Sequence, residues 1–415
     1  MNELPVGDQS NILSGLRVID CGTYIAGPST ATIMADFGAE VIKIERPPHG
    51  DPYRRLSFLP GMPVSDMNYC WLLDARNRKS LALDLQDEAA REALRRLVQT
   101  TDVFITNYPP DLTSKFGVGY AELARINPQL IYAHVTGYGV EGEDTDKPGY
   151  DTTAYWARSG LTALLFDLTV QTGAAPCGTG DHMVGLALFG SIMLALYQRQ
   201  MTGRGTKVST SLMATGAWSN SCQIQAAMVG AAFPIRRPRT VPLNPLVNQY
   251  QTRDGKRFIF CCLDTVRDWG RVCRAIGRAE LIGDERYRTA ESRSERSQEV
   301  VALLDEAIGS KDLAEWEILF REQDIIWGLI STMDRVADDP QMKANGVFAS
   351  MDHPQHGRIQ TVSNPLQVQG AIKENPKPAP NVGEHSFEIL RSLGYQDATI
   401  EEMIRRGVTM PTAND

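Results

Sequence analysis

Residues 16–45 read LRVIDCGTYIAGPSTATIMADFGAEVIKIE, and this stretch decides the fold. RVID at 17–20 contains β-branched residues and predicts a short strand. Small residues at 27–38 predict a helix that ends at Gly38, a common residue type at helix C-termini. VIKIE at 41–45 predicts a second strand. Strand, helix and strand in this order indicate a βαβ unit, in which the two strands run parallel.

The same alternation continues as far as residue 139. SLALDL at 80–85 and DVFITN at 102–107 predict strands on either side of a helix at 87–101, whose Ala90, Leu94 and Leu97 form one apolar face. A short helix is expected at 120–128, and LIYAHVTGYG at 130–139 predicts the next strand. The alternation favours an α/β fold with a Rossmann-like large domain and a parallel sheet.

The remainder of the chain predicts a second, smaller domain. Met183–Tyr197 is nearly apolar but shorter than the about 20 residues of a membrane span, so we expect a buried helix. Residues 236–245 are rich in proline and arginine and indicate a linker, and residues 248–263 predict a hairpin that turns at Asp254 and Gly255. We expect a large domain from 1–225, a small α+β domain with linkers from 226–335, and a C-terminal segment at 336–415 that rejoins the large domain.

Composition narrows the functional class. A net charge of −8 disfavours nucleic acid as a partner, and an anionic ligand would need a local positive pocket. The seven cysteines form no CxxC pair, which favours free thiols in a reducing compartment. The six histidines do not cluster with the cysteines at metal-ligand spacing, so no metal is expected, and His353 and His356 lie in a predicted loop. The N-terminus lacks the pattern of a leader, so we expect a soluble, cytoplasmic protein without a membrane association.

Two common enzyme motifs are missing or out of context. Gly137, Gly139 and Gly142 match the spacing of a dinucleotide fingerprint, but residues 143–151 contain proline and turn formers where that motif requires a helix. A nicotinamide enzyme with Glu45 as ribose acceptor therefore stays a weak alternative. The chain contains no GxSxG, which disfavours a serine hydrolase.

Basic residues gather around the ends of the early predicted strands. They are Arg46, Arg54, Arg55, Arg76, Arg78 and Lys79. Ligands of open α/β sheets bind outside the carboxyl ends of the strands, and Arg46 directly follows the second strand. These residues predict a pocket for an anion, and a solvated charged edge is the alternative.

Asp181 is the candidate of most interest. It follows two glycines in GTGD at 178–181 and precedes the apolar helix, so it lies at or near a helix N-terminus. Capping that helix is one explanation. The other is a nucleophile that the helix N-terminus keeps ionised, with neighbouring amides that stabilise an oxyanion.

Together these segments resemble the class III CoA-transferases of the CaiB/BaiF type. The matching segments lie at 13–54, 77–87, 148–161, 180–212, 244–259 and 353–366. The resemblance implies that Asp181 is the nucleophile, which attacks an acyl-CoA to form a mixed anhydride and then an aspartyl-CoA thioester. It further implies a CoA thioester as co-substrate, a carboxylic acid acceptor, no metal and no redox cofactor.

The resemblance also assigns the CoA contacts by position. They correspond to Ile25, Ala26, Arg46, Leu83, Asp84, Leu85, Gln86, Asn107, Tyr108, Pro109, Lys115, Val135, Thr136, Gly137 and Tyr138. The chain departs from the family at Thr136 and Gln86, where relatives carry lysine, and at Lys115, which replaces an arginine and loses bidentate phosphate geometry. We therefore expect phosphate contacts to shift to Arg78 or Lys79. The tetraglycine loop of formyl-CoA transferases is also missing.

The segment at 148–161 is most similar to the branch that handles aryl or branched acids and dicarboxylates, such as benzylsuccinate, phenyllactate or mesaconate. The resemblance suggests succinyl-CoA as donor and Tyr150, Tyr155 and Trp156 around the acyl group, with core packing as the alternative for Tyr155 and Trp156. It implies an interlocked dimer of identical chains, or a homologous partner subunit in a heteromeric transferase. An α-methylacyl-CoA racemase is the other alternative, but racemases carry a histidine of their acid/base pair at the position of Tyr150.

Overall fold

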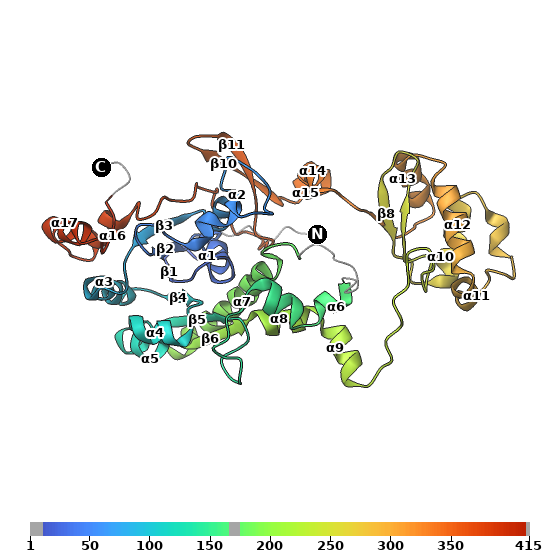
Figure 1. The fold of residues 1–415 in the computed structure, drawn as a ribbon. Coiled ribbons are helices and arrows are strands. Elements are labelled where there is room, and N and C mark those ends of the chain that lie inside the picture. Colours follow the sequence, from blue (N-terminus) through green and yellow to red (C-terminus); the bar gives the residue numbers. More distant parts are fainter. Residues whose placement is uncertain (1–10, 166–174, 412–415) are drawn as a thin grey trace. The chain divides into compact units, whose positions relative to one another are not determined.

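The computed structural model describes residues 11–165 and 175–411 (Figure 1). The described residues form two compact units, one within Met1–Gly230 and Ala344–Asp415, the other within Ala231–Lys343. The sequence predicted domain boundaries after residues 225 and 335. These boundaries stay predictions.

The first unit contains a six-stranded sheet, a separate hairpin and most of the helices. Its strands are β1 (Arg17–Asp20), β2 (Glu40–Glu45), β3 (Arg78–Ala82), β4 (Val103–Thr106), β5 (Ile131–Thr136), β6 (Lys207–Ser211), β10 (Phe348–His353) and β11 (Gly357–Val362). Its helices are α1 (Ala26–Asp36), α2 (Tyr69–Asp74), α3 (Glu88–Val98), α4 (Pro110–Phe116), α5 (Tyr120–Ile126), α6 (Leu161–Leu165), α7 (Thr179–Thr202), α8 (Leu212–Ser219), α9 (Ser221–Met228), α16 (Ser386–Ser392) and α17 (Asp397–Arg405), with a 3₁₀ turn η1 (Pro52–Phe58) and a π-helical turn η2 (Asp151–Ala157).

The large sheet is parallel throughout, in the order β3-β2-β1-β4-β5-β6. This is the strand order of a Rossmann-like fold, so the predicted α/β class is correct. The order reverses between β1 and β4, and both strands end at the same edge of the sheet. That edge is where ligands bind in such folds.

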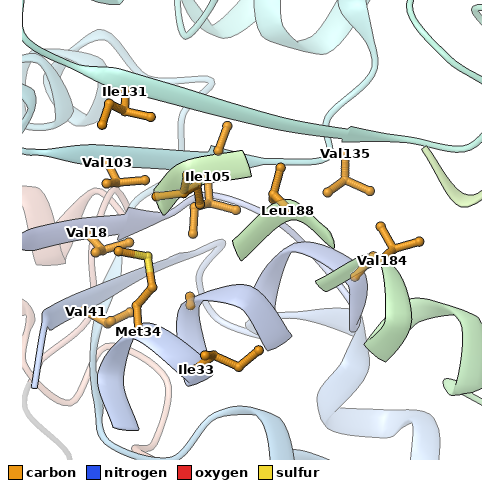
Figure 2. Close-up of a cluster of buried hydrophobic side chains, with 14 of the residues drawn as sticks. Val18, Ile33, Met34, Val41, Val103, Ile105, Ile131, Val135, Val184 and Leu188 are labelled. Atoms are coloured by element: carbon orange, nitrogen blue, oxygen red, sulfur yellow. The ribbon is translucent and has the colours of Figure 1, made fainter. Parts of the chain in front are cut away.

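Alternating side chains bury the two faces of the sheet against different helices. Val18, Val103 and Ile105 join one core with residues of α1 and α7, as Figure 2 shows. Ile19 and Phe104, their neighbours in sequence, join a second core with residues of α3, α5, α16 and α17. Near-continuous apolar strands are expected for a parallel sheet that is covered on both sides.

Helix α7 differs from the buried helix that the sequence predicted. It is 24 residues long, and Val184, Leu188 and Ile192 bury one face against the sheet and α1. Among the described residues it is the one helix long and apolar enough to cross a membrane by length and composition, and only 33% of its most apolar window is buried. Leu194, Tyr197 and Met201 are exposed. The helix therefore has one buried and one exposed apolar face.

The C-terminal segment returns to the outer strand of the sheet. The amide of Ala82 in β3 donates to the hydroxyl of Ser386 at the start of α16, and the amide of Asp84 donates to the carbonyl of Val408 after α17. Strands β10 and β11 form their own antiparallel pair and do not join the large sheet.

The second unit is an α+β arrangement with its own core. Its elements are β7 (Gln249–Gln251), β8 (Arg257–Phe260), α10 (Thr265–Ala275), η3 (Ala279–Ile282), α11 (Ala290–Glu295), α12 (Ser297–Ile308), α13 (Leu313–Glu322), β9 (Trp327–Leu329), α14 (Met333–Val336) and α15 (Pro340–Ala344). Strands β7 and β8 form the predicted hairpin, in which Gly255 takes a positive φ of 77°. The core of this unit contains the buried aromatic side chains of Phe258, Phe260 and Trp316.

Candidate active site

The loop after β1 is fixed to the loop after β4 at the point where the strand order reverses. The backbone amide of Thr23 donates to Oδ1 of Asn107 at 2.9 Å, and Nδ2 of Asn107 donates to the carbonyl of Thr23 at 2.8 Å. Asn107 thus sets the position of the chain that enters α1. These two contacts join the loops at the edge of the sheet where ligands of such folds bind.

Most predicted CoA contacts lie along this edge. Ile25 and Ala26 begin α1, and Arg46 follows β2 with an exposed side chain. The others follow or end neighbouring strands: Leu83, Asp84, Leu85 and Gln86 after β3, Asn107, Tyr108 and Pro109 after β4, and Val135, Thr136, Gly137 and Tyr138 at the end of β5. Lys115 is exposed on α4. These residues stay predicted contacts, now gathered at one edge of one sheet.

Arg78 and Lys79 lie elsewhere, which disfavours the shift of phosphate contacts to them. They are the first residues of β3, so they lie toward the amino ends of the strands. Arg78 is buried and donates to Oδ2 of Asp20 at 2.6 Å, and Lys79 pairs with Glu40 and Glu388. Both side chains therefore have structural partners.

A buried lysine that the sequence did not reveal supports the same loop. Nζ of Lys43 in β2 lies 2.8 Å from Asp51 and 3.4 Å from Asp20, and it donates to the carbonyl of Gly22 at 2.6 Å. Its two carboxylate partners raise the pKa of Lys43 although burial opposes this shift. The sequence offered one signal for it, which is a single lysine within the apolar strand VIKIE. A charge buried in such a strand needs a partner of opposite charge.

The remaining basic residues divide into paired and exposed groups. Arg54 donates to both carboxylate oxygens of Glu45. The nicotinamide alternative required Glu45 to bind a ribose, and its oxygens already have this partner. Arg76 is paired in the same way with Asp36. Arg46 and Arg55 are exposed. The positive charge available to an anionic ligand at this edge therefore comes from a smaller set than the sequence suggested.

Asp151 stabilises the N-terminus of α7 from another part of the chain. Gly178 is the N-cap and takes a positive φ of 81°, and the amide of Gly180 donates to Oδ1 of Asp151 at 3.2 Å. A Cβ on Gly180 would lie 2.3 Å from Cγ of Tyr155, so only glycine permits this approach. The explanation of Asp181 as the cap is wrong, because Asp151 receives the helix amide. The proposed oxyanion site loses the Gly180 amide for the same reason.

Asp181 is the third residue of α7 and is half-buried. Burial raises the pKa of Asp181 to about 7, the negative charges of Asp151 and Asp74 add to this shift, and His182 opposes it. The helix N-terminus, which was expected to keep Asp181 ionised, is therefore opposed by burial and by two neighbouring carboxyl groups. With this pKa, both protonation states of Asp181 are populated near neutral pH. Small changes in its surroundings then decide whether the carboxyl group is ionised.

His182 connects the start of α7 to α2. Its Nδ1 lies 2.8 Å from the carbonyl oxygen of Gly178 and its Nε2 lies 3.0 Å from Oδ1 of Asp74. The hydroxyl of Tyr53 donates to the other oxygen of Asp74 at 2.5 Å. Sequence reasoning missed this network, because Asp74 is 108 residues from His182 and no motif links them.

The three aromatic candidates separate in the structure. Tyr155 and Trp156 are buried in the core that α7 shares with the sheet, which favours core packing, and their place around an acyl group stays a prediction. Tyr150 is 60% exposed and meets the ring of Tyr24 edge-on, with centroids 5.8 Å apart. Tyr24 has a positive φ of 60°, a rare conformation for a non-glycine residue that clusters at functional sites. Tyr150 is thus exposed and Tyr24 half-buried, unlike the buried Tyr155 and Trp156.

Within residues 11–165 and 175–411, no group of three histidine, cysteine or acidic side chains could hold a metal ion.

Two glycines of the segment 137–149 allow the backbone to pack closely. A Cβ on Gly137 would lie 2.8 Å from Cα of Gly149. This contact brings the loop after β5 back to Tyr150 and Asp151. Close backbone approach therefore explains Gly137 and Gly149, whereas Gly139 and Gly142 take positive φ angles of 114° and 96°.

The fold and site define an α/β protein with a half-buried acidic side chain beside the ligand edge of a Rossmann-like sheet. The model of CoA-transferase family III matches residues 13–386. The chain belongs to this family and is a class III CoA-transferase, which uses a CoA thioester as co-substrate.

Several named enzymes resemble it over nearly their full length. It is 34% identical over 405 residues to cinnamoyl-CoA:phenyllactate CoA-transferase of Clostridium sporogenes, covering 95% of this chain and 97% of the relative. It is 32% identical over 391 residues to (R)-2-hydroxy-4-methylpentanoate CoA-transferase of Clostridioides difficile (94% and 97%), and 30% identical over 411 residues to human succinyl-CoA:glutarate CoA-transferase (97% and 92%).

A solved structure confirms the fold. The crystal structure of a CAIB/BAIF family protein from Brucella suis superimposes with a TM-score of 0.80 at 28% identity, over 93% of this chain and all of that one. The relatives act on different acids, so the family is established and the particular substrates are a separate question.

Proposed function

We propose that this enzyme transfers CoA from an acyl-CoA donor to an aryl-substituted, branched or dicarboxylic acid through a covalent intermediate on Asp181. The observation that carries the proposal is the position of Asp181 in the first turn of α7, beside the start of α1. A Cβ on Gly178 would lie 3.1 Å from Cδ1 of Ile25, so the start of α7 adjoins the predicted CoA contacts of α1. A nucleophile placed there can meet the thioester end of a CoA that lies along the sheet edge.

In the proposed reaction an ionised oxygen of Asp181 attacks the thioester carbon of the donor. The carbon–sulfur bond breaks, CoA leaves as a thiolate, and a mixed anhydride remains on the enzyme. The thiolate then attacks the Asp181 carbonyl carbon and releases the donor acid, which leaves an aspartyl-CoA thioester. The acceptor carboxylate reverses the two steps and departs as the new thioester. Covalent catalysis divides one difficult exchange into steps of similar energy.

The acceptor class follows from the open aromatic pair and from the relatives. Tyr24 and Tyr150 offer an edge-to-face surface that suits an aryl or branched acyl group. The relatives named above act on phenyllactate, 2-hydroxy-4-methylpentanoate and glutarate. We propose acceptors such as benzylsuccinate or phenyllactate and succinyl-CoA as a donor. Arg46 and Lys115, both exposed, are the proposed phosphate contacts.

The test is exchange between acids. The enzyme is incubated with succinyl-CoA and a panel of aryl, branched and dicarboxylic acids, and the CoA esters are identified by mass spectrometry. We expect new esters with the wild type and none with Asp181→Asn, while Asp352→Asn on the β10–β11 hairpin leaves exchange unchanged. Deuterium incorporation at the α-carbon without exchange between acids would support the racemase instead.

A further inference from the structure

Both ring nitrogens of His182 face hydrogen-bond acceptors. A carbonyl oxygen can only accept, so Nδ1 must carry a proton to bond Gly178 at 2.8 Å. Asp74 accepts the hydroxyl of Tyr53 through one oxygen and lies 3.0 Å from Nε2 through the other, as an ionised carboxylate would. A neutral imidazole has one N–H and cannot satisfy both partners. The contacts therefore define His182 as an imidazolium cation.

The partners of His182 are themselves fixed. Asp74 is 3% exposed and ends α2, and its backbone carbonyl accepts the hydroxyl of Thr32 at 2.7 Å as well as a donor from Arg78. Tyr53 is 2% exposed. Because Asp74 and the Tyr53 that donates to it are both buried, the cation is held between Asp74 and the Gly178 carbonyl at the start of α7. Burial lowers the pKa of His182, but Asp74 outweighs it and the pKa rises to about 9.

The groups that surround Asp181 come from three helical elements and one loop. Asp151 of η2 and Asp74 of α2 are carboxyl groups, Cys177 lies before α7, and His182 is the cation among the described groups that act on Asp181. Burial raises the pKa of Asp151 itself. Two neighbouring carboxylates and partial burial all favour the protonated, non-nucleophilic form of Asp181. The positive charge that opposes them comes from the residue next in the chain.

We propose that His182 is a positioning residue that, fixed as a cation by Asp74 and Gly178, keeps the Asp181 carboxylate ionised between two other carboxylates and so sets the pH range in which the enzyme works. This inference rests on the proposed role of Asp181. It assigns a function to the histidine that follows the nucleophile and to a buried network with Asp74 and Tyr53.

The first experiment reads the charge state without any substrate. Protein labelled with ¹³C at the aspartate carboxyl is titrated by NMR, and the Asp181 resonance is identified by its loss in Asp181→Asn. We expect a midpoint near pH 7 in the wild type. His182→Gln should move it upward by at least about one pH unit, because the amide keeps a hydrogen bond but not the charge. His182→Lys should restore it, and the exposed His356→Gln should leave it unchanged.

Asp74→Asn provides a second, independent variant. It removes the anion that holds the proton on His182, so the cation is lost near neutral pH, but it also removes one carboxylate near Asp181. We therefore expect an upward shift smaller than that of His182→Gln. An unchanged Asp181 midpoint in both variants would overturn the proposal, as would equal shifts with His356→Gln.

The kinetic counterpart uses succinyl-CoA alone and measures the rate of CoA attachment to the protein against pH. His182→Gln should slow attachment about tenfold below the wild-type midpoint and stay within about threefold of it at high pH. An equal loss at every pH would show a structural role and contradict the proposal. If the NMR shifts occur but no CoA attaches to the wild type, the proposed function fails while the charge assignment stands.

Discussion

At the scale of one residue, the pKa of Asp181 shows what the proposed nucleophile costs the fold. A carboxyl whose pKa rises on folding, here from 3.8 to about 7, binds more protons in the folded state between these two values. Its contribution to the free energy of folding therefore becomes unfavourable as pH rises through this window, and the full cost applies above it. This cost is consistent with the proposed role of Asp181, since the proposed reaction needs an ionised carboxylate at this position.

Asp181→Asn is accordingly expected to stabilise the fold. At about pH 8 the variant should gain about 1–2 kcal/mol in free energy of unfolding, a value reduced because Asp181 is partly exposed. Near pH 4 the gain should vanish, because the carboxyl of the native protein is already neutral. Urea denaturation at the two pH values measures the difference. Equal stability of variant and wild type at both would show that Asp181 is not destabilised in the folded state.

Helix α7 is the element on which the site depends, and its glycines are placed for close approach. Gly180 allows contact with Tyr155 and Asp151, and Gly185 allows contact with Ser29 of α1, whose Oγ would lie 2.1 Å from an added Cβ. These positions determine where the first turn of the helix lies. The helix N-terminus is thus fixed by packing from η2 and α1.

Gly180→Ala should displace that first turn and reduce exchange by at least about 100-fold, because misplacement of a reacting group by about 1 Å has this effect. Gly270→Ala in α10 is the matched control, since its added Cβ meets only the end of the Arg274 side chain at 3.5 Å. Steady-state kinetics of both variants gives the comparison. Near-wild-type activity of Gly180→Ala would show that the close contact between Gly180 and Tyr155 is not required.

Sequence patterns predicted the elements better than their contacts. The β-branched runs and the βαβ alternation predicted the parallel sheet, and Asp254-Gly255 predicted the hairpin, because these patterns are local in the sequence. The carboxyl groups that act on Asp181, those of Asp151 and Asp74, could not be predicted, because they come from distant segments, and neither could the contact that joins the neighbouring His182 to Asp74. For Arg78, Tyr155 and Trp156 residue type indicated a ligand, whereas the burial of all three side chains favours structural roles.

For the whole molecule, the exposed apolar face that begins on α7 is the main unexplained surface. Leu194, Tyr197 and Met201 recur at helical spacing and are 65–73% exposed, and Trp218 of α8 is 80% exposed. Large exposed apolar patches mark interaction sites. We propose that a second copy covers this face, in agreement with the dimer that the resemblance implied.

The double variant Leu194→Glu and Met201→Glu should therefore yield monomers, while Val64→Glu, a fully exposed loop position, should not. Light scattering coupled to size-exclusion chromatography gives the masses. A wild-type mass of one chain, 45.8 kDa, at micromolar concentration would contradict the proposal, and a dimer that persists in the double variant would place the interface elsewhere.

The central claim is that CoA becomes bonded to Asp181, and peptide mapping of the trapped enzyme tests it most directly. The wild type is mixed with succinyl-CoA, quenched and digested, and the peptide that carries the mass of CoA is sequenced by mass spectrometry. The account predicts CoA on Asp181 in the wild type and an unmodified peptide in Asp181→Asn. Attachment at another residue, or exchange by Asp181→Asn at the wild-type rate, would contradict it.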